Sequence, residues 1–406
     1  MKEAFMKTRT FDIALEFLWL IIPMLLFLSM LGKIFENNGL NNLYTYQAQA
    51  FLNGKLNIEE NLNSLPAEVA LSNGKYYNIF PPFPTLILLP FVAVFGAANV
   101  KVTLVAFMIG LLSCYLLYRI LKLLEVDPIL SIWVLAAFML GTAYWQTLRH
   151  SDGVWMFAQI VSVCCIFLAI HEALGKGCGT LAGLFLGAAF LSRQLSIYSS
   201  IFIIILLWRN PNPPQKKANL LGFLAIFGIC LFSYVAFNYL QFGTFETGYA
   251  KMVLKGVAPE DFGGELYQKY GLFSLAYLPF NATYMFLQGF HIDFNAGKQI
   301  IDLDPYGTSL IAASPFVFAS FFAKLEHIKL WAAWLSITLT LIHMLLYFNN
   351  GFIQFNAQRF TLDFMPILII LVALGLKNIS NDLSKMIKGA IIYAIILNTV
   401  TLVLVK

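Results

Sequence analysis

Apolar runs of about 20 residues recur along the chain, and they constrain its fold more than any other feature. Each is long enough to cross about 30 Å of hydrocarbon as a helix. They extend from Ile13 to Lys406, and the runs 129–148 and 307–322 are two examples. Because they are continuously apolar and lack the period-two alternation of barrel strands, they predict an all-α polytopic membrane protein.

Basic residues predict how the chain crosses the membrane. Lys2, Lys7 and Arg9 precede the first run, and no small-x-small cleavage site follows it, so we interpret it as a retained span with a cytoplasmic N-terminus. Counting spans with basic segments inside predicts about 11 transmembrane helices in one integral-membrane domain, residues 1–406. The net charge of +5 is scattered over span ends, so nucleic-acid binding is not expected.

Two long polar segments, 34–98 and 241–306, then lie on the outer face. In the first outer loop, 34–98, Tyr44, Ala48 and Phe51 recur at helical spacing and predict a helix on the membrane surface. The apolar piece 85–95 is too short to span the membrane, so we expect it to be a second surface helix. We expect these helices to cover a substrate cavity.

Arg193 lies between two unusually short apolar runs, 181–191 and 196–208. A charge between half-length helices is tolerated when it lines a cavity or is buried in protein. A guanidinium there can hold a lipid phosphate bidentately. The alternative is a snorkelling or internally paired arginine.

Asp152 follows His150 in the short outer segment Arg149-His150-Ser151-Asp152-Gly153. Its carboxylate is a candidate ligand for a divalent cation, or could position a phosphate through a metal. The alternative is a solvated turn in which Asp152 caps the next helix.

Arg359 opens a late apolar run and is followed by Asp363 one helical turn later. An i,i+4 ion pair between the two is one interpretation. The other is that Arg359 converges with Arg193 on the same anionic headgroup.

The order of these features resembles the GT-C superfamily of membrane glycosyltransferases. Within it the chain is most similar, over approximately residues 10–375, to family 39 or dolichyl-phosphate-mannose-type mannosyltransferases and their bacterial aminoarabinose-transferase relatives. The resemblance rests on three motifs and Asp152 between later spans. The motifs are Tyr44-x-Tyr46-Gln47-Ala48-Gln49-Ala50-Phe51-Leu52-x-Gly54, Tyr77-x-x-Phe80-Pro81-Pro82 and Gly183-Leu184-x-x-Gly187-x-x-Phe190-Leu191-Ser192-Arg193.

The resemblance implies transfer of a hexosyl or pentosyl group from a polyprenyl-phosphate carrier to an unidentified lipid, glycan or protein acceptor, on the outer face of a bacterial inner membrane. No nucleotide or soluble cofactor is expected, and a divalent metal is used by some members only. Asp152 matches an acidic catalytic residue, and Arg193 matches the basic residue that contacts the carrier phosphate. Arg359 matches a further basic residue, with His150 beside the same phosphate. The substrate cavity is assigned to Tyr44, Tyr77, Pro81, Pro82 and Glu246.

One position departs from the family pattern. Members usually carry Asp or Asp-Glu at the start of the first surface helix as general base, and here the matching catalytic positions are Asn41 and Asn42. An amide cannot accept a proton as a carboxylate does. Either another acid substitutes, or Asp152 acts alone, or the chain has lost this chemistry. The outer candidates are Glu59, Glu60 and Glu246.

Two other function classes compete with the enzyme. A transporter or flippase should show paired halves with broken helices in matching positions, whereas these halves are asymmetric. A degenerate relative that serves as a binding subunit gains weight from the missing acid at Asn41 and Asn42.

Overall fold

The computed structural model describes Met24, Gln354 and the segments 27–212, 215–245, 247–253, 264–298, 300–351 and 357–404. Most of the first apolar run, which begins at Ile13, lies outside these residues. Glu246, one of the expected cavity residues, also lies outside them.

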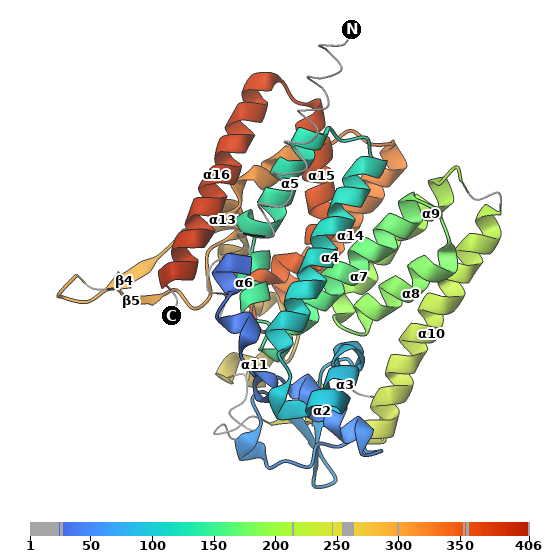
Figure 1. The fold of residues 1–406 in the computed structure, drawn as a ribbon, viewed down its shortest axis with the longest axis vertical. Coiled ribbons are helices and arrows are strands. Elements are labelled where there is room, and N and C mark those ends of the chain that lie inside the picture. Colours follow the sequence, from blue (N-terminus) through green and yellow to red (C-terminus); the bar gives the residue numbers. More distant parts are fainter. Residues whose placement is uncertain are drawn as a thin grey trace.

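Helices form the body of the molecule (Figure 1). In the described part of the chain, five helices are long and apolar enough to cross a membrane, and further apolar helices have 10–17 residues. The long ones are α4 (Val102–Leu123), α7 (Val154–Leu174), α10 (Lys216–Phe242), α14 (His327–Leu346) and α16 (Asn381–Leu404). The shorter ones include α3 (Phe83–Phe95), α5 (Pro128–Gly141), α8 (Gly179–Phe190), α9 (Ser199–Arg209) and α15 (Met365–Asn378). A membrane protein is therefore supported, and the count of about 11 spans is not confirmed.

Two runs that the sequence presents as continuous are broken in the structure. Run 129–148 divides into α5 and α6 (Tyr144–Arg149), and run 307–322 divides into α13 (Leu310–Ala313) and the 3-10 helix η10 (Pro315–Phe322). The two breaks are joined by a hydrogen bond, since the Ser314 hydroxyl donates to the Gly141 carbonyl at the end of α5, at 2.6 Å. Such pairing lets interrupted helices persist inside a bundle.

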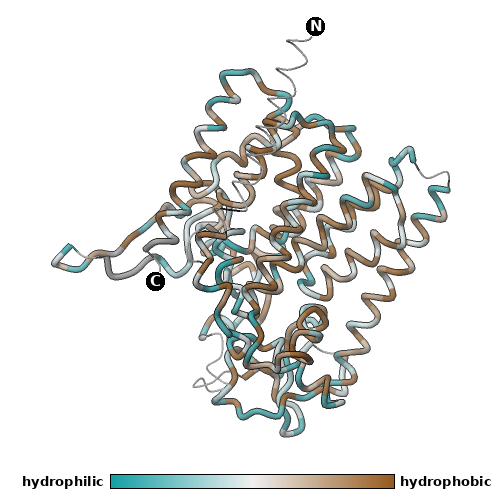
Figure 2. Tube along the Cα trace, viewed as in Figure 1, coloured by the Kyte–Doolittle hydropathy of each residue, from teal (hydrophilic) through white to brown (hydrophobic). Residues whose placement is uncertain are grey.

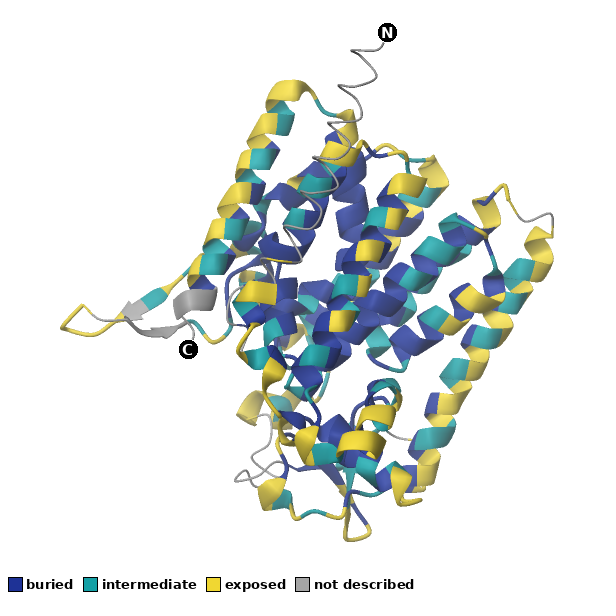
Figure 3. Ribbon diagram, in the orientation of Figure 1, coloured by how far each residue is buried: buried dark blue, intermediate teal, exposed yellow. Residues whose placement is uncertain are grey.

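The core is built around α7. In its most apolar window 83% of the residues are buried, against 22% in α10 and 17% in α16, whose outer faces are exposed (Figure 3). Both helices are rich in apolar residues (Figure 2), and their exposed side chains include Phe232 and Leu240 on α10 and Met386 and Ile396 on α16, as expected of helices that face lipid. On α8, a Cβ at Gly179 would lie 1.6 Å from the Asn219 carbonyl oxygen, so the absence of a side chain lets α8 and α10 approach closely.

Residues 34–98, which we call the cap, cover one end of the bundle (Figure 1). They contain α2 (Leu43–Leu52) and α3, at the places where two surface helices are expected, and a hairpin of β1 (Val69–Ser72) and β2 (Lys75–Asn78). Strand β3 (Met252–Val253) pairs with the other edge of β1, so the sheet order is β2-β1-β3. The all-α expectation holds for the bundle but missed this sheet.

The segment 241–306 carries small elements. Besides β3 it contains α11 (Gly264–Tyr270), α12 (Leu278–Ala282), the π-helix η9 (Thr283–Leu287) and the 3-10 turns η6 (Gly248–Lys251) and η8 (Leu275–Tyr277). The hairpin of β4 (Ile292–Phe294) and β5 (Ile300–Leu303) projects sideways from the bundle (Figure 1). Residues from η6, β3 and the stretch between α11 and η8 contribute to the cavity described below.

Candidate functional site

A cavity of about 630 Å³ lies between the cap and the bundle. Its volume is in the range of small-molecule sites. Most of the lining is aromatic or aliphatic, and charge enters at only a few points. The lining residues are Glu68, Ile79, Phe80, Trp155, Phe190, Arg193, Gln194, Leu195, Ile197, Tyr198, Tyr234, Thr247, Tyr249, Met252, Leu272, Phe273, His343, Met344, Tyr347, Phe348, Asn349, Gly351, Arg359 and Phe360.

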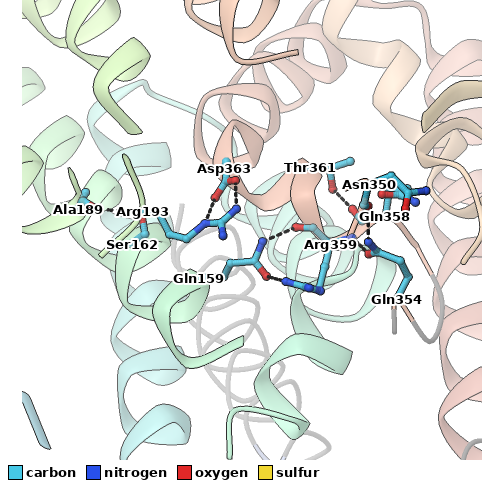
Figure 4. Close-up of polar contacts among 10 residues, drawn as sticks. All are labelled: Gln159, Ser162, Ala189, Arg193, Asn350, Gln354, Gln358, Arg359, Thr361 and Asp363. Carbon is cyan, nitrogen blue, oxygen red and sulfur yellow. Dashed lines mark hydrogen bonds and ion pairs between the residues drawn. The ribbon is translucent and has the colours of Figure 1, made fainter. Parts of the chain in front are cut away.

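Arg193 reaches the cavity from the break between α8 and α9. It has extended backbone (φ −146°) and precedes the 3-10 turn η5 (Gln194–Tyr198). Its guanidinium donates bidentately to Asp363, from Nε to Oδ1 at 3.0 Å and from Nη2 to Oδ2 at 2.5 Å (Figure 4). Asp363 is almost fully buried, so the charge of Arg193 is already offset inside the protein.

The expected i,i+4 pair of Arg359 with Asp363 is therefore wrong. Residues 359–363 form the 3-10 helix η11 (Arg359–Asp363) and not an α-helical turn. With three residues per turn, positions four apart no longer share a face. The carboxylate of Asp363 consequently turns to Arg193 and leaves Arg359 without it.

Arg359 is buried beside a neutral partner. Its Nη1 donates to Gln159 Oε1 at 3.1 Å, and Gln159 Nε2 donates back to the Arg359 carbonyl at 3.1 Å (Figure 4). Its Nε finds no hydrogen-bond partner in the described parts of the chain, although the residue is only 5% exposed. A buried cation whose side-chain partner is an amide has no directly bonded negative charge, which favours binding of an anion.

The two arginines share one wall of the cavity. The guanidinium carbons of Arg193 and Arg359 lie 5.3 Å and 5.0 Å from the centre of the Phe360 ring. Both guanidiniums therefore gain cation–π stabilisation from the same ring. The two arginines therefore line the same cavity, and the charge of Arg193 is already offset by Asp363.

Glu68 brings a carboxylate from the cap to the same cavity, immediately before β1. Its Oε2 is buried and has no hydrogen-bond partner among the residues described. Burial raises the pKa of Glu68 above its usual value, and its own backbone amide and the Arg359 cation lower this pKa less. Sequence reasoning named Glu59 and Glu60 but missed this residue.

A turn motif could have found Glu68. Asn73-Gly74 joins β1 to β2 with φ of 51° and 72°, as a hairpin turn of type I′ requires. An Asn-Gly pair between two short apolar segments is a strong hairpin signal. Recognising it would have placed Glu68 at the start of a strand and not in an open loop.

Asn41, Asn42 and Asp152 lie together outside the cavity lining. Asn41 Nδ2 donates to Asp152 Oδ2 at 3.2 Å, and Asn42 Nδ2 donates to the Ser151 carbonyl at 3.4 Å. The Asn42 side chain also caps α2, since its Oδ1 accepts from the Tyr44 amide at 3.0 Å. These contacts tie the cap to the loop before α7, which is a structural role.

The loop around His150 offers neither a cationic imidazole nor, in the described segments, a cluster of metal ligands. Burial first, and then the cations Lys33 and Arg149, lower the pKa of His150 to about 3, so its imidazole is neutral at pH 7. Lys33 Nζ lies 3.5 Å from His150 Nδ1. In the described segments no group of three His, Cys, Asp or Glu residues could hold a metal, and the neighbour of Asp152 is an amide donor.

Tyr44 and Tyr77, which were expected in the cavity, are not among its lining residues. Tyr44 is fully buried against Phe80 and Phe157, with ring centres 6.4 Å and 6.3 Å away. Tyr77 packs edge-on against Phe242 at 5.6 Å, with its ring outside the cavity lining.

The proline pair positions the cap and is not part of the lining. Pro81 and Pro82 precede α3, whose Phe83 amide donates to the Leu191 carbonyl at 2.9 Å. This bond joins the cap to the end of α8, two residues before Arg193. Phe80, next to Pro81, does line the cavity.

Two kinds of comparison with known proteins gave matches, one to a family model and one to solved structures. Residues 80–237 match the family model of dolichyl-phosphate-mannose-protein mannosyltransferases. The fold is similar to that of ArnT from Cupriavidus metallidurans bound to undecaprenyl phosphate, with 13% identity and a TM-score of 0.51 over 93% of this chain and 62% of that chain. For ArnT in the apo state the identity is 11% and the TM-score is 0.49, over 94% of this chain and 62% of that chain. No curated protein matches the chain.

The chain thus spans less than two thirds of the length of ArnT. Two comparisons bear on the resemblance expected from the sequence motifs. The family model covers α3 to α10, including Arg193, and the structural likeness covers nearly the whole chain. The expected resemblance to dolichyl-phosphate-mannose-type mannosyltransferases over residues 80–237, and to ArnT in its fold, is therefore confirmed.

Proposed function

We propose that the protein is a glycosyltransferase that moves a sugar from a polyprenyl-phosphate carrier to a lipid, glycan or protein acceptor. The observation that carries this proposal is the buried guanidinium of Arg359, which lines the cavity without a carboxylate partner in the described chain. A phosphodiester monoanion supplies the missing charge and accepts from a planar donor group. The solved ArnT structure, which contains undecaprenyl phosphate, supports a lipid phosphate as the anion.

The cavity can also hold a sugar and exclude water. Aromatic rings, among them Trp155, Tyr249 and Tyr347, form its walls, and their hydroxyl and indole groups add polar contacts. In the reaction the acceptor hydroxyl forms a bond to the anomeric carbon while the bond from that carbon to the phosphate oxygen breaks. The polyprenyl phosphate departs with the electron pair, and Arg359 stabilises the charge that develops on it.

Orientation follows from the charges at the ends of α4. The Val102 amide at its start donates to Asn38 Oδ1 of the cap at 2.8 Å. Its 22 residues span about 33 Å, so Arg119 and Lys122 lie at the end remote from the cap. Because basic residues favour the cytoplasmic side, we infer that the cap and the active site face outward, in a bacterial inner membrane.

No soluble cofactor is part of this proposal, because the carrier phosphate is itself the leaving group. The chemistry assigned to Asp152 through a divalent metal is not used, since the donor set around Asp152 does not fit a cation.

The proposal is tested with Arg359→Gln in purified, detergent-solubilised protein. We expect binding of undecaprenyl phosphate, measured by native mass spectrometry, to weaken about 30-fold or more, because a charge-assisted bond to a buried group is lost. Sugar transfer from a polyprenyl-phosphate donor should fall with it. Arg209→Gln is the matched control, since Arg209 pairs with Glu326 at the end of α9, away from the cavity. Equal binding by both variants would contradict the proposal.

A binding subunit without catalysis is the competing function, favoured by the amides at Asn41 and Asn42. The same measurements separate the two. A subunit that only binds would take up polyprenyl phosphate through Arg359 and show no transfer with any donor or acceptor supplied.

A further inference from the structure

The transfer reaction releases a proton from the hydroxyl group that receives the sugar. At the positions where related enzymes carry the general base for this proton, this chain has amides. Asn41 and Asn42 are engaged in fixing the cap, and Asp152 accepts from Asn41 outside the cavity lining. Asp363 is committed through both oxygens to Arg193. In the described part of the chain, the remaining carboxylate that lines the cavity is Glu68.

Glu68 is held firmly enough to act on a substrate. It precedes Val69, which is paired with Asn78 of β2 on one side and Val253 of β3 on the other. β1 is thus the central strand of its sheet. A site built on a paired strand is more precisely placed than one on a free loop.

The rest of the cap braces this sheet. Gln47 of α2 accepts through its Oε1 from Asn78 Nδ2, at 2.9 Å, and from the Thr85 hydroxyl of α3. These bonds connect α2, β2 and α3 around the sheet that carries Glu68.

We propose that Glu68 is the general base that takes the proton from the acceptor hydroxyl. This proposal rests on the glycosyltransferase function proposed above. As the acceptor oxygen bonds to the anomeric carbon, its O–H bond breaks and the proton passes to Oε2 of Glu68. The bond between that carbon and the phosphate oxygen breaks with its electrons going to polyprenyl phosphate. Glu68 ends neutral and returns its proton to water when the products leave.

The charges in the cavity suit this division of roles. Arg359 and Glu68 attract each other electrostatically, while Arg193 is neutralised by Asp363. Arg359 then serves the leaving phosphate and Glu68 the incoming hydroxyl, so the acceptor enters on the cap side. Burial raises the pKa of Glu68, which makes its carboxylate a stronger base than an exposed glutamate.

The test uses Glu68→Gln and Glu68→Asp, with Glu59→Gln as the matched control on the exposed surface of the cap, where Glu59 pairs with Lys55. We expect Glu68→Gln to lower kcat by about 10²- to 10⁴-fold while polyprenyl-phosphate binding stays within about threefold of wild type. Glu68→Asp keeps a carboxylate and should restore part of the rate. Glu59→Gln should behave as wild type.

The pH profile and an anionic nucleophile distinguish a base from a merely structural residue. Wild-type kcat/KM should fall as the pH drops through the pKa of Glu68, which lies above the ordinary glutamate value, and this fall should be absent from the residual activity of Glu68→Gln. Azide needs no deprotonation. It should therefore form glycosyl azide from the donor at similar rates with wild type and Glu68→Gln.

Each outcome bears on one claim. Wild-type transfer together with an unchanged rate in Glu68→Gln would overturn the role of Glu68 and leave the proposed function standing. Loss of donor binding in Glu68→Gln, or azide transfer that falls as much as transfer to the acceptor, would make Glu68 a structural residue and also overturn it. A wild-type protein without any transfer would instead refute the proposed function.

Discussion

Asp363→Asn is predicted to destabilise the protein and at the same time to increase its affinity for polyprenyl phosphate. The exposed fractions of the Arg193 and Asp363 side chains are 18% and 2%, so the pair is buried. Removing one partner of a buried ion pair costs about 3–5 kcal/mol, because the other charge is left uncompensated. The amide oxygen of asparagine still accepts one bond, so we expect about 3 kcal/mol.

A double-mutant cycle isolates the pair. The cycle compares Arg193→Met, Asp363→Leu and the variant with both substitutions. The double variant replaces both charges by apolar groups, which is often close to neutral for a buried pair. The free energies of unfolding, measured by denaturant titration in detergent micelles, should therefore show a coupling of about 2–4 kcal/mol between the two positions. Additive single-mutant effects, or an Asp363→Asn protein within about 0.5 kcal/mol of wild type, would refute the reasoning.

The functional consequence has the opposite sign. Freed from Asp363, the Arg193 guanidinium adds a second uncompensated cation beside Arg359, and one new charge-assisted bond of about 1.5 kcal/mol would tighten polyprenyl-phosphate binding about tenfold. Arg193→Gln leaves the Asp363 carboxylate unpaired at the cavity and should weaken the same binding. If Asp363→Asn and Arg193→Gln weaken polyprenyl-phosphate binding equally, then Asp363 does not limit the interaction of Arg193 with the phosphate.

Two further predictions concern the framework. Asn42→Ala removes the side-chain hydrogen bond at the N-terminus of α2 and should lower the free energy of unfolding by about 0.5–2 kcal/mol, with activity retained below the melting transition. A large loss of kcat in fully folded protein would instead indicate a catalytic role for Asn42. Gly179→Leu places side-chain atoms against the Asn219 backbone, whereas Gly228→Leu on α10 points into open space. Gly179→Leu should therefore lower the melting temperature, measured by fluorescence-detected unfolding, far more than Gly228→Leu. Equal shifts of the melting temperature would contradict the close packing of α8 and α10.

Sequence patterns predicted the apolar bundle and the ends of the cap helices well. The helix expected around Tyr44 is α2, and the piece 85–95 corresponds to α3, which ends at Phe95. Arg193 could be singled out because a charge between two half-length helices needs a polar environment. These features depend on local composition, which a sequence displays directly.

The partners of the charges could not be predicted in the same way. Asp363 lies 170 positions from Arg193, and Gln159 lies 200 positions from Arg359. Which carboxylate meets which guanidinium depends on how α7, α8 and η11 pack, and a 3-10 helix at 359–363 removed the local alternative. Glu68 was missed for a related reason, since β1 is completed by β3 from a segment far along the chain.

The amides at Asn41 and Asn42 show how a departure from a family pattern can be explained by the fold. Asparagine at position 41 donates to Asp152, whereas a carboxylate there would face a like charge at 3.2 Å. The cap is thus attached where a catalytic acid was expected. A carboxylate from the same cap, Glu68, lines the cavity instead.

The central claim is that Arg359 binds the phosphate of a polyprenyl carrier inside the cavity. A cryo-electron microscopy map of the protein with undecaprenyl phosphate, in lipid nanodiscs, tests this most directly. We predict phosphate density within hydrogen-bond distance of the Arg359 guanidinium, with the Arg193–Asp363 pair intact and Glu68 facing the same cavity. Phosphate bound beside His150 and Asp152, with the cavity empty, would contradict it.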